Sequence, residues 1–208
     1  MRSKTAPESF IERARREQIV AAAMQVIADG GYGQASLAKI AEHAGIAKSV
    51  VLYHFKAKSD IIDAVVGVVF ATAAMRMLPA ISAATSPADR LAAYIRSNAA
   101  FIAENPTAAT AMVEIVTGYR SPEGLRLDQA ASSAPADEGL AALDPEAILA
   151  DGVASGQFRA LSPRFMKNAV RAALDGAAWE LARDPAYDVL GYAEELVTAF
   201  DLATRAPQ

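Results

Sequence analysis

Hydrophobic residues recur along most of this chain at the three- and four-residue spacing of one helix face. Glycine and proline interrupt the pattern at intervals and divide it into segments of helical length. The predicted helices cover 10–29, 36–43, 47–54, 59–78, 86–105, 106–119, 144–156, 163–183 and 186–205. No internal repeat and no convincing strand interrupts this series. The pattern therefore predicts an all-α protein.

Single residues predict where the long fourth helix begins and ends, and composition predicts a loop after the sixth helix. Ser59 is a suitable N-cap for the fourth helix, and Pro79 is expected to close it. The stretch 121–144 is rich in proline, glycine and serine. We expect it to be irregular, with a short helical turn near Leu125.

Two short helical patterns meet at a glycine within the stretch from Ser36 to Lys58. Ser36 is a good N-cap, and Gly45 supplies the backbone freedom that a sharp corner requires. The second segment carries apolar residues on one side, namely Val51, Leu52 and Phe55. It leaves polar residues to point elsewhere, namely Lys48, Ser49, Tyr53 and His54. This arrangement is typical of a helix-turn-helix, whose second helix commonly enters the major groove of DNA.

Charge is distributed unevenly along the chain, although its net value of −4 alone argues weakly against nucleic acid. Residues 1–60 hold nine Lys or Arg against six acids, whereas residues 61–208 hold eleven against eighteen. A basic small module joined to an acidic larger one suits a protein whose N-terminal end alone meets phosphate. Arg13, Arg15 and Arg16 are either phosphate contacts or part of a solvated charged face.

The composition narrows the chemistry that the chain offers. Cysteine is absent, which excludes disulfides and thiolate catalysis. His43 and His54 are the only histidines, so we expect neither a metal site nor a histidine base, and no nucleophile or cofactor motif appears. No signal peptide is visible, and the longest apolar run, 64–75, is far short of the ~20 residues that a spanning helix needs. We expect a soluble, cytoplasmic protein that makes no membrane contact and is not an enzyme.

The stretch from Gly31 to Ile62 resembles the DNA-binding region of the TetR family of bacterial transcriptional regulators. The resemblance rests on a set of positions, namely Ser36, Ile40, Ala41, Ala44, Gly45, Ile46, Lys48, Leu52, Tyr53, His54, Phe55 and Lys58. By position it implies DNA contacts from Ser36, Leu37, Ala47, Lys48, Ser49, Val50, Tyr53, His54 and Lys58. The body, 60–208, resembles the family only in its helical layout. The resemblance implies a homodimer, a palindromic operator in double-stranded DNA and a ligand-responsive body.

Three residues depart from the usual pattern of that family. Ala47 stands where Ser or Thr often caps the recognition helix, so that side-chain cap is expected to be missing. Leu52 stands where tyrosine is frequent, which removes one backbone contact. Lys39 replaces the acid that would complete a capping box with Ser36. None of these departures is expected to abolish the fold.

The body offers a candidate pocket and a candidate dimer interface. The candidate pocket residues lie on the fifth, sixth and eighth helices: Tyr94, Asn98, Phe101, Met112, Ile115, Tyr119 and Trp179. An apolar stripe at this spacing is usually core, and Asn98 is the residue that favours a small-molecule pocket, since a buried amide needs a polar partner. The last two helices are long and rich in small residues. We expect them to pair with their copies in a second subunit.

These observations predict a ligand-responsive transcriptional regulator, a repressor in the favoured interpretation. Residues 1–58 would form the DNA-binding domain, and residues 59–208 would form the domain for ligand binding and dimerisation. The alternative is a helical dimer whose head docks on a protein partner rather than on DNA.

Overall fold

The computed structural model describes residues 9–121, 123–127 and 143–207, and they form helices joined by short connections. The helices are α1 (Phe10–Gly30), the single-turn η1 (Tyr32–Gln34), α2 (Leu37–His43), α3 (Lys48–His54), α4 (Lys58–Ala83), α5 (Pro87–Glu104), α6 (Pro106–Gly118), α9 (Pro145–Ala154), α10 (Pro163–Arg183) and α11 (Val189–Thr204). Among the described residues, the one β-type contact is an isolated bridge between Phe158 and Arg205. The all-α prediction is confirmed.

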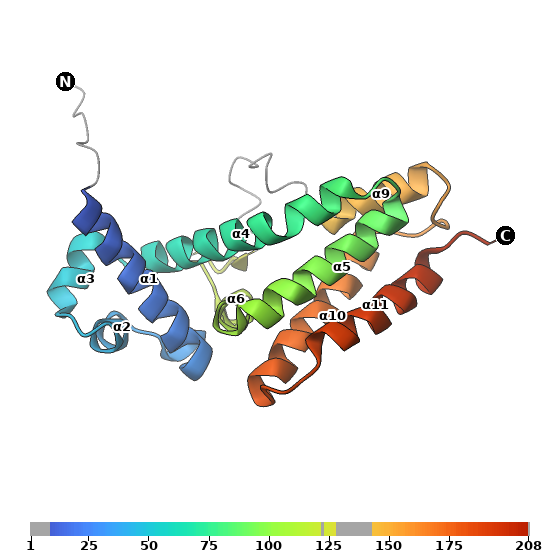
Figure 1. The fold of residues 1–208 in the computed structure, drawn as a ribbon. Coiled ribbons are helices and arrows are strands. Elements are labelled where there is room, and N and C mark those ends of the chain that lie inside the picture. Colours follow the sequence, from blue (N-terminus) through green and yellow to red (C-terminus); the bar gives the residue numbers. More distant parts are fainter. Residues whose placement is uncertain (1–8, 122, 128–142, 208) are drawn as a thin grey trace, which may run out of the picture.

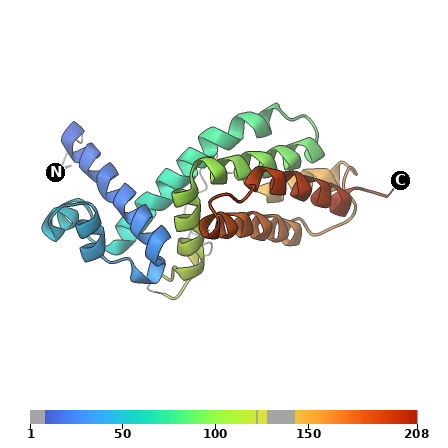
Figure 2. The same ribbon diagram turned by 60° about the horizontal axis from the view of Figure 1, so that its bottom comes forward.

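The helices separate into a small head and a larger body (Figure 1). Helices α1, α2 and α3 form the head, and α4 runs from the head along the body (Figures 1 and 2). In the body, α5 packs against α4 and α11, while α10 packs against α5, α6 and α9. Helix α6 contacts both α1 and α10, so it lies between the head and the rest of the body (Figure 2).

Side-chain caps explain where several helices begin. Ser36 and Ser86 accept hydrogen bonds from the main-chain N–H of the residue three positions later, as their sequence context predicts. At the start of α1, Ser9 and Glu12 form a reciprocal capping box. Asp188 caps α11, which therefore begins at Val189 rather than at Ala186.

The two predicted ends of the fourth helix are wrong. Asp60, not Ser59, organises the start of α4, because its carboxylate accepts hydrogen bonds from the N–H groups of Lys56 and Ala57 at 2.9 and 3.2 Å. The helix also continues past Pro79 to Ala83. Pro79 faces solvent, where water can satisfy the carbonyl that the proline leaves free.

One continuous core joins the head to the body. Ile19, Ile40 and Val51 are fully buried in the head, and Ile95 and Leu149 are fully buried in the body. In the predicted irregular stretch 121–144, residues 123–126 are not helical and Leu127 is helical, while residues 122 and 128–142 lie outside the described residues.

Helix α4 is the one described helix that is long and apolar enough to cross a membrane by length and composition. Only 28% of its most apolar window is buried. Val68 and Met75 lie on its exposed face, with 44% and 73% of their surface accessible. The prediction from the shorter run 64–75 therefore underestimated the apolar length of this helix.

Candidate nucleic-acid interface and body cavity

The corner between α2 and α3 has the geometry of a helix-turn-helix. Gly45 has a φ of 65°, a left-handed conformation that glycine adopts without steric cost. The main-chain N–H groups of Gly45 and Ile46 donate to the carbonyls of Glu42 and Ala41 at 3.1 and 3.0 Å. These bonds satisfy the last turn of α2 and send the chain into α3. The predicted glycine corner is confirmed.

Helix α3 is anchored by fewer residues than its sequence indicates. Val51 and the following Phe55 are fully or almost fully buried, whereas Leu52 is 42% exposed. The prediction that Leu52 shares their buried side is wrong, since it follows Val51 directly and points about a quarter-turn away. Ala47 makes no side-chain cap at the start of α3, and Lys39 completes no capping box with Ser36, as expected.

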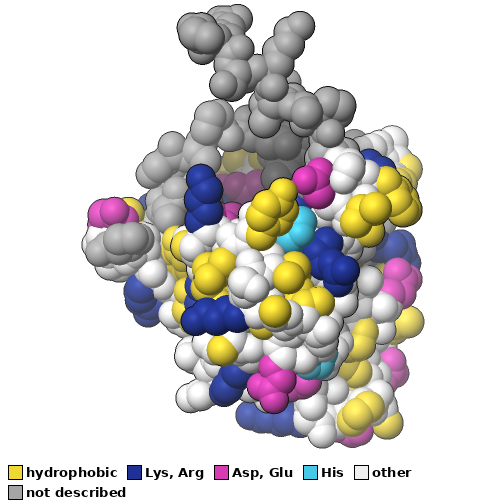
Figure 3. Space-filling model, turned by 90° about the vertical axis from the view of Figure 1, so that its left-hand side faces the viewer, with side chains coloured by type: hydrophobic (Ala, Val, Ile, Leu, Met, Phe, Trp, Pro, Cys, Tyr) yellow, Lys and Arg dark blue, Asp and Glu magenta, His cyan; other side chains and the backbone are white. Residues whose placement is uncertain are grey.

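The predicted DNA-contacting residues fall into an exposed and a half-buried group. Ser36, Ala47, Lys48, Ser49 and Tyr53 are exposed. Leu37, Val50, His54 and Lys58 are half-buried. Figure 3 views the molecule from the head end and shows Lys and Arg side chains spread among hydrophobic ones on this face. The exposed group thus presents hydrogen-bonding side chains and a lysine to solvent on α2 and α3.

Arg16 has a packing role that sequence reasoning left open. Its guanidinium donates to the main-chain carbonyl of His54 at 2.7 Å and lies 4.2 Å from the centre of the Phe55 ring. These contacts fasten α1 to the C-terminal end of α3. Arg15 donates to Gln18 at 2.7 Å along α1. Arg13 is exposed and lies 5.9 Å from the ring of Phe10.

Lys58 is engaged inside the protein in this structure. Its ammonium donates to the main-chain carbonyl of Tyr32 at 2.7 Å and lies 4.0 Å from the centre of the Tyr32 ring. Burial lowers the pKa of this lysine. A phosphate contact by Lys58 would therefore compete with its bond to Tyr32.

Helix α6 and the residue after it also contact Tyr32, the residue that Lys58 binds. The carboxylate of Glu114 accepts a hydrogen bond from the main-chain N–H of Tyr32 at 3.3 Å. The ring of Tyr32 packs over Gly118, where an added Cβ would lie 2.9 Å from it, and meets Tyr119 edge to face. Predicted as a pocket residue, Tyr119 lies instead at this junction of head and body.

A cavity of about 90 Å³ lies inside the body among α4, α5, α6 and α10. Its walls are mostly apolar: Val69, Phe70, Ala73, Met77, Phe101, Ile102, Ala109, Met112, Val113, Leu143 and Ala178. Its polar lining residues are Tyr94, Asn98, Arg171 and Asp175. Four of the predicted pocket residues therefore line it: Tyr94, Asn98, Phe101 and Met112. Ile115, Tyr119 and Trp179 lie outside the lining, because Ile115 is fully buried in the core and the other two are half-buried elsewhere.

Asp175 and Arg171 were missed by the sequence reasoning. Asp175 lies one turn after Arg171 on α10, within a run of small apolar residues. An acid among small apolar residues on a predicted core helix was the available signal. Burial raises the pKa of the Asp175 carboxyl, and the nearby Arg171 guanidinium partly opposes this rise. Asn98 has one weak contact, from its amide nitrogen to the sulfur of Met77 at 3.8 Å.

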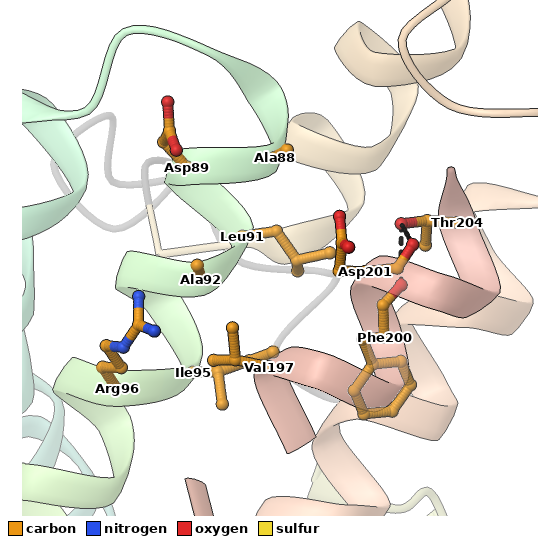
Figure 4. A pocket seen from close by; sticks show the side chains of 10 residues that line it. All are labelled: Ala88, Asp89, Leu91, Ala92, Ile95, Arg96, Val197, Phe200, Asp201 and Thr204. Carbon is orange, nitrogen blue, oxygen red and sulfur yellow. Dashed lines mark hydrogen bonds between the residues drawn. The ribbon is translucent and has the colours of Figure 1, made fainter. Parts of the chain in front are cut away.

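A groove of about 230 Å³ lies between α5 and α11 (Figure 4). Its polar groups are already paired. Arg96 makes two 2.7 Å bonds to Glu194, and the Thr204 hydroxyl donates to the carbonyl of Phe200 at 2.7 Å. The groove is therefore a weaker candidate for ligand binding than the cavity, where the one hydrogen bond of a polar lining side chain to another described residue is the weak contact of Asn98.

Large apolar side chains are exposed on α10 and α11, the predicted dimer helices. Phe165 on α10 is 75% exposed, and Leu190 and Leu202 on α11 are 54% and 67% exposed. Small residues, Ala169 and Ala172, continue this exposed surface along α10. Among the described residues, no three His, Asp or Glu side chains lie close enough together to hold a metal ion.

A basic helix-turn-helix head on an all-helical body defines the class of a DNA-binding transcriptional regulator. Residues 19–65 match the family model of bacterial regulatory proteins, tetR family. The fatty acid metabolism regulator protein of Bacillus subtilis (strain 168) is 43% identical over 51 residues, which are 24% of this chain and 26% of that protein. The match thus spans about a quarter of the relative and falls short of its whole length.

Solved structures share the fold over nearly the whole chain. The fatty acid degradation regulator FadR from Bacillus halodurans has a TM-score of 0.70 at 22% identity, covering 96% of this chain and 97% of that one. FadR from Bacillus subtilis, in complex with stearoyl-CoA, has a TM-score of 0.64 at 24% identity, covering 88% and 95%. The TetR family regulator PfmR from Thermus thermophilus has a TM-score of 0.64 at 24% identity, covering 93% and 97%.

The head and the start of α4 thus match the family model of bacterial regulatory proteins, tetR family, and the whole chain shares the fold of these solved regulators.

Proposed function

We propose that this protein is a repressor that binds a palindromic operator as a homodimer and releases it when a small molecule occupies the body. The observation that carries the proposal is that α3 has one side buried against the head and another side exposed to solvent. Val51 and the adjoining Phe55 anchor the helix, while Lys48, Ser49 and Tyr53 are exposed. Such a helix can enter a major groove with hydrogen-bonding side chains toward the bases and phosphates. Residues 1–58 would be the DNA-binding unit of a soluble, cytoplasmic protein.

The dimer would form through α10 and α11. The exposed Phe165, Leu190 and Leu202 provide apolar surface, and the small residues between them allow close approach of a second helix pair. An isologous contact of these helices would produce a four-helix interface. The two α3 helices would then read half-sites about one helical turn apart, roughly 34–36 Å, or somewhat more if the heads separate.

The effector would bind in the cavity among α4, α5, α6 and α10, and we propose a long-chain acyl-CoA. The apolar lining supports an acyl chain, and the similar FadR from Bacillus subtilis was solved with stearoyl-CoA. The cavity of about 90 Å³ is smaller than the ~300 Å³ at which ligand pockets commonly begin. An acyl chain would therefore have to move the walls apart, which gives the ligand different affinities for two conformations.

Two helices that line the cavity, α4 and α6, also contact the head. Helix α4 contributes Val69 and Phe70 to the cavity and Lys58 to the bond with Tyr32. Helix α6 contributes Met112 to the cavity and Glu114 to the same corner of the head. Displacement of either wall would shift the head and change the separation of the two α3 helices. Ligand and operator would thus oppose each other through a coupling free energy.

The test is binding to the DNA that flanks the protein's own gene, measured by fluorescence anisotropy at several salt concentrations. We expect affinity that falls steeply with salt, and at least a tenfold loss in Lys48→Ala and Tyr53→Ala. Arg76→Ala is the matched control, because Arg76 pairs with Glu104 on the body surface, away from the head. Absence of binding at low salt would contradict the repressor proposal and favour a head that docks on protein.

A further inference from the structure

A pocket of about 510 Å³ lies at the end of the body that is far from the head (Figure 1). Three segments enclose it, namely the last turn of α4 with the link to α5, the first turn of α5, and α9. Its volume falls in the range of about 300–1,000 Å³ that is usual for small-molecule sites. It shares no lining residue with the cavity among α4, α5, α6 and α10. This pocket is therefore a separate candidate site.

Arg90, which lines this pocket, has a buried nitrogen without a partner. Its Nε is fully buried and makes no hydrogen bond. An Nη nitrogen of the same guanidinium donates to the Asp151 carboxylate at 2.7 Å. A buried donor without an acceptor costs free energy, and the cost is larger for a charged group than for a neutral one. An acceptor placed in the pocket beside Arg90 would remove this cost.

The charged side chains around Arg90 are of both signs. Asp144, the N-cap of α9, and Asp151 also line the pocket. Lys167 on α10 donates to Asp144 and to Glu146 at 3.3 and 2.6 Å. Two basic side chains therefore stand beside three acidic ones, which leaves one excess negative charge. This excess would repel a ligand that is only an anion, whereas a ligand that is only a cation would leave the Arg90 Nε without an acceptor.

Apolar side chains complete the lining of the pocket. They are Ile81, Ala84, Ala147 and Ile148, and both isoleucines are only 4% exposed. The bond between Arg90 and Asp151 places a positive and a negative group side by side in the same pocket. An α-amino acid carries its ammonium and its carboxylate on one carbon atom, so it can pair with both groups in antiparallel order.

We propose that this pocket binds a free α-amino acid with an apolar side chain. The ligand carboxylate accepts a hydrogen bond from the Arg90 Nε, and the ligand ammonium donates to the Asp151 carboxylate. The apolar side chain packs on Ile81 and Ile148. Because the ligand is neutral overall, it does not add to the excess negative charge of the site. This inference goes beyond the proposed function, since both the site and its ligand differ from those of the effector cavity.

The test is isothermal titration calorimetry of the full chain with leucine and three blocked derivatives. N-acetylleucine keeps only the negative charge, leucinamide keeps only the positive charge, and N-acetylleucinamide has neither. We expect leucine to bind more tightly than each derivative by about tenfold or more, as loss of one charged hydrogen bond predicts. Arg90→Lys keeps the charge but removes the Nε–H, and it should weaken leucine binding by about tenfold.

Asp151→Asn tests the other half of the site. This variant should weaken the binding of leucine, because the ammonium loses its charged partner. It should strengthen the binding of N-acetylleucine, because the excess negative charge is removed. Arg96→Lys and Glu194→Gln are the matched controls, since this ion pair joins α5 to α11 and does not line the pocket.

Melting curves for every variant separate a folding defect from a binding defect. Absence of leucine binding, equal binding of leucine and N-acetylleucinamide, or an Arg90→Lys variant with unchanged affinity would each overturn the inference. Each of these outcomes would leave operator binding by the head intact. Failure here therefore differs from failure of the repressor proposal, in which DNA binding itself is absent.

Discussion

The ammonium of Lys58 and the main-chain carbonyl of Tyr32 are joined by a 2.7 Å hydrogen bond across the junction of head and body. The same ammonium lies 4.0 Å from the centre of the Tyr32 ring. Lys58 begins α4, and Tyr32 follows the C-terminal end of α1. One lysine therefore connects the long helix of the body to the turn that carries the helix-turn-helix.

Replacing this lysine should destabilise the head. Lys58→Met keeps most of the side-chain length but removes the charged donor, and we expect a loss of about 1–2 kcal/mol in the free energy of unfolding. Urea denaturation measures it. Lys56→Met is the matched control, because Lys56 is exposed and its side chain makes no contact of this kind. Equal stability of the two variants would contradict the structural role of Lys58.

Glu114 should transmit the effector signal without being needed for DNA binding. In Glu114→Ala the 3.3 Å bond to the Tyr32 N–H is lost, while the α3 surface is unchanged. We expect operator affinity within about threefold of wild type, and a loss of a large part of a coupling that is typically 1–3 kcal/mol. Anisotropy titrations with and without acyl-CoA measure both quantities. A variant that responds fully to the effector would show that α6 does not carry the signal through Glu114.

The carboxyl of Asp175 should make stability depend on pH. Burial raises its pKa in the folded state, so between the unfolded and the folded pKa the folded protein holds more protons than the unfolded one. The free energy of unfolding therefore falls as pH rises through this window, and the deficit persists at neutral pH. Asp175→Asn should raise the melting temperature at pH 7 and have little effect below the unfolded pKa. A uniform effect at all pH values would contradict this explanation.

Two glycines should respond oppositely to alanine. A Cβ at Gly152 would collide with the ring of Phe158, whereas a Cβ at Gly67 meets nothing within 4 Å. We expect Gly152→Ala to cost about 1–3 kcal/mol of stability, because the packed ring must move. Gly67→Ala should stabilise α4 by about 0.5–1 kcal/mol, since alanine loses less backbone entropy in a helix. Thermal unfolding of both variants measures the contrast.

The exposed apolar residues of α10 and α11 should hold the dimer together. Leu202→Glu combined with Phe165→Glu places charges on the proposed interface, and we expect a monomer whose operator affinity falls at least tenfold. Met75→Glu is the matched control, because Met75 is equally apolar and 73% exposed on α4. Light scattering and anisotropy report the two effects. A double variant that remains dimeric would place the interface elsewhere.

Local patterns of residues were sufficient to predict most of the helices. Ser36, Ser86 and Gly45 each act through groups within a few positions along the chain, so their roles as caps or as the corner follow from the local sequence. The match between the predicted and observed α10, 163–183, has the same origin. The predicted end of α4 at Pro79 failed because burial of Met77 and Ile81 against the body holds the helix together past the proline.

The contacts on which the proposed function rests depend on residues far apart in the chain. Lys58 meets Tyr32, Glu114 meets the same tyrosine across 82 positions, and Asp175 shares a cavity with Tyr94. Such pairs leave no periodic signal, since each depends on how whole helices cross. The sequence by itself therefore determined the helices, the helix-turn-helix and the family resemblance, because these arise from short-range hydrogen bonding and hydrophobic spacing. Only the tertiary structure decided which side chains line the cavity and which join body to head, because long-range packing brings them together.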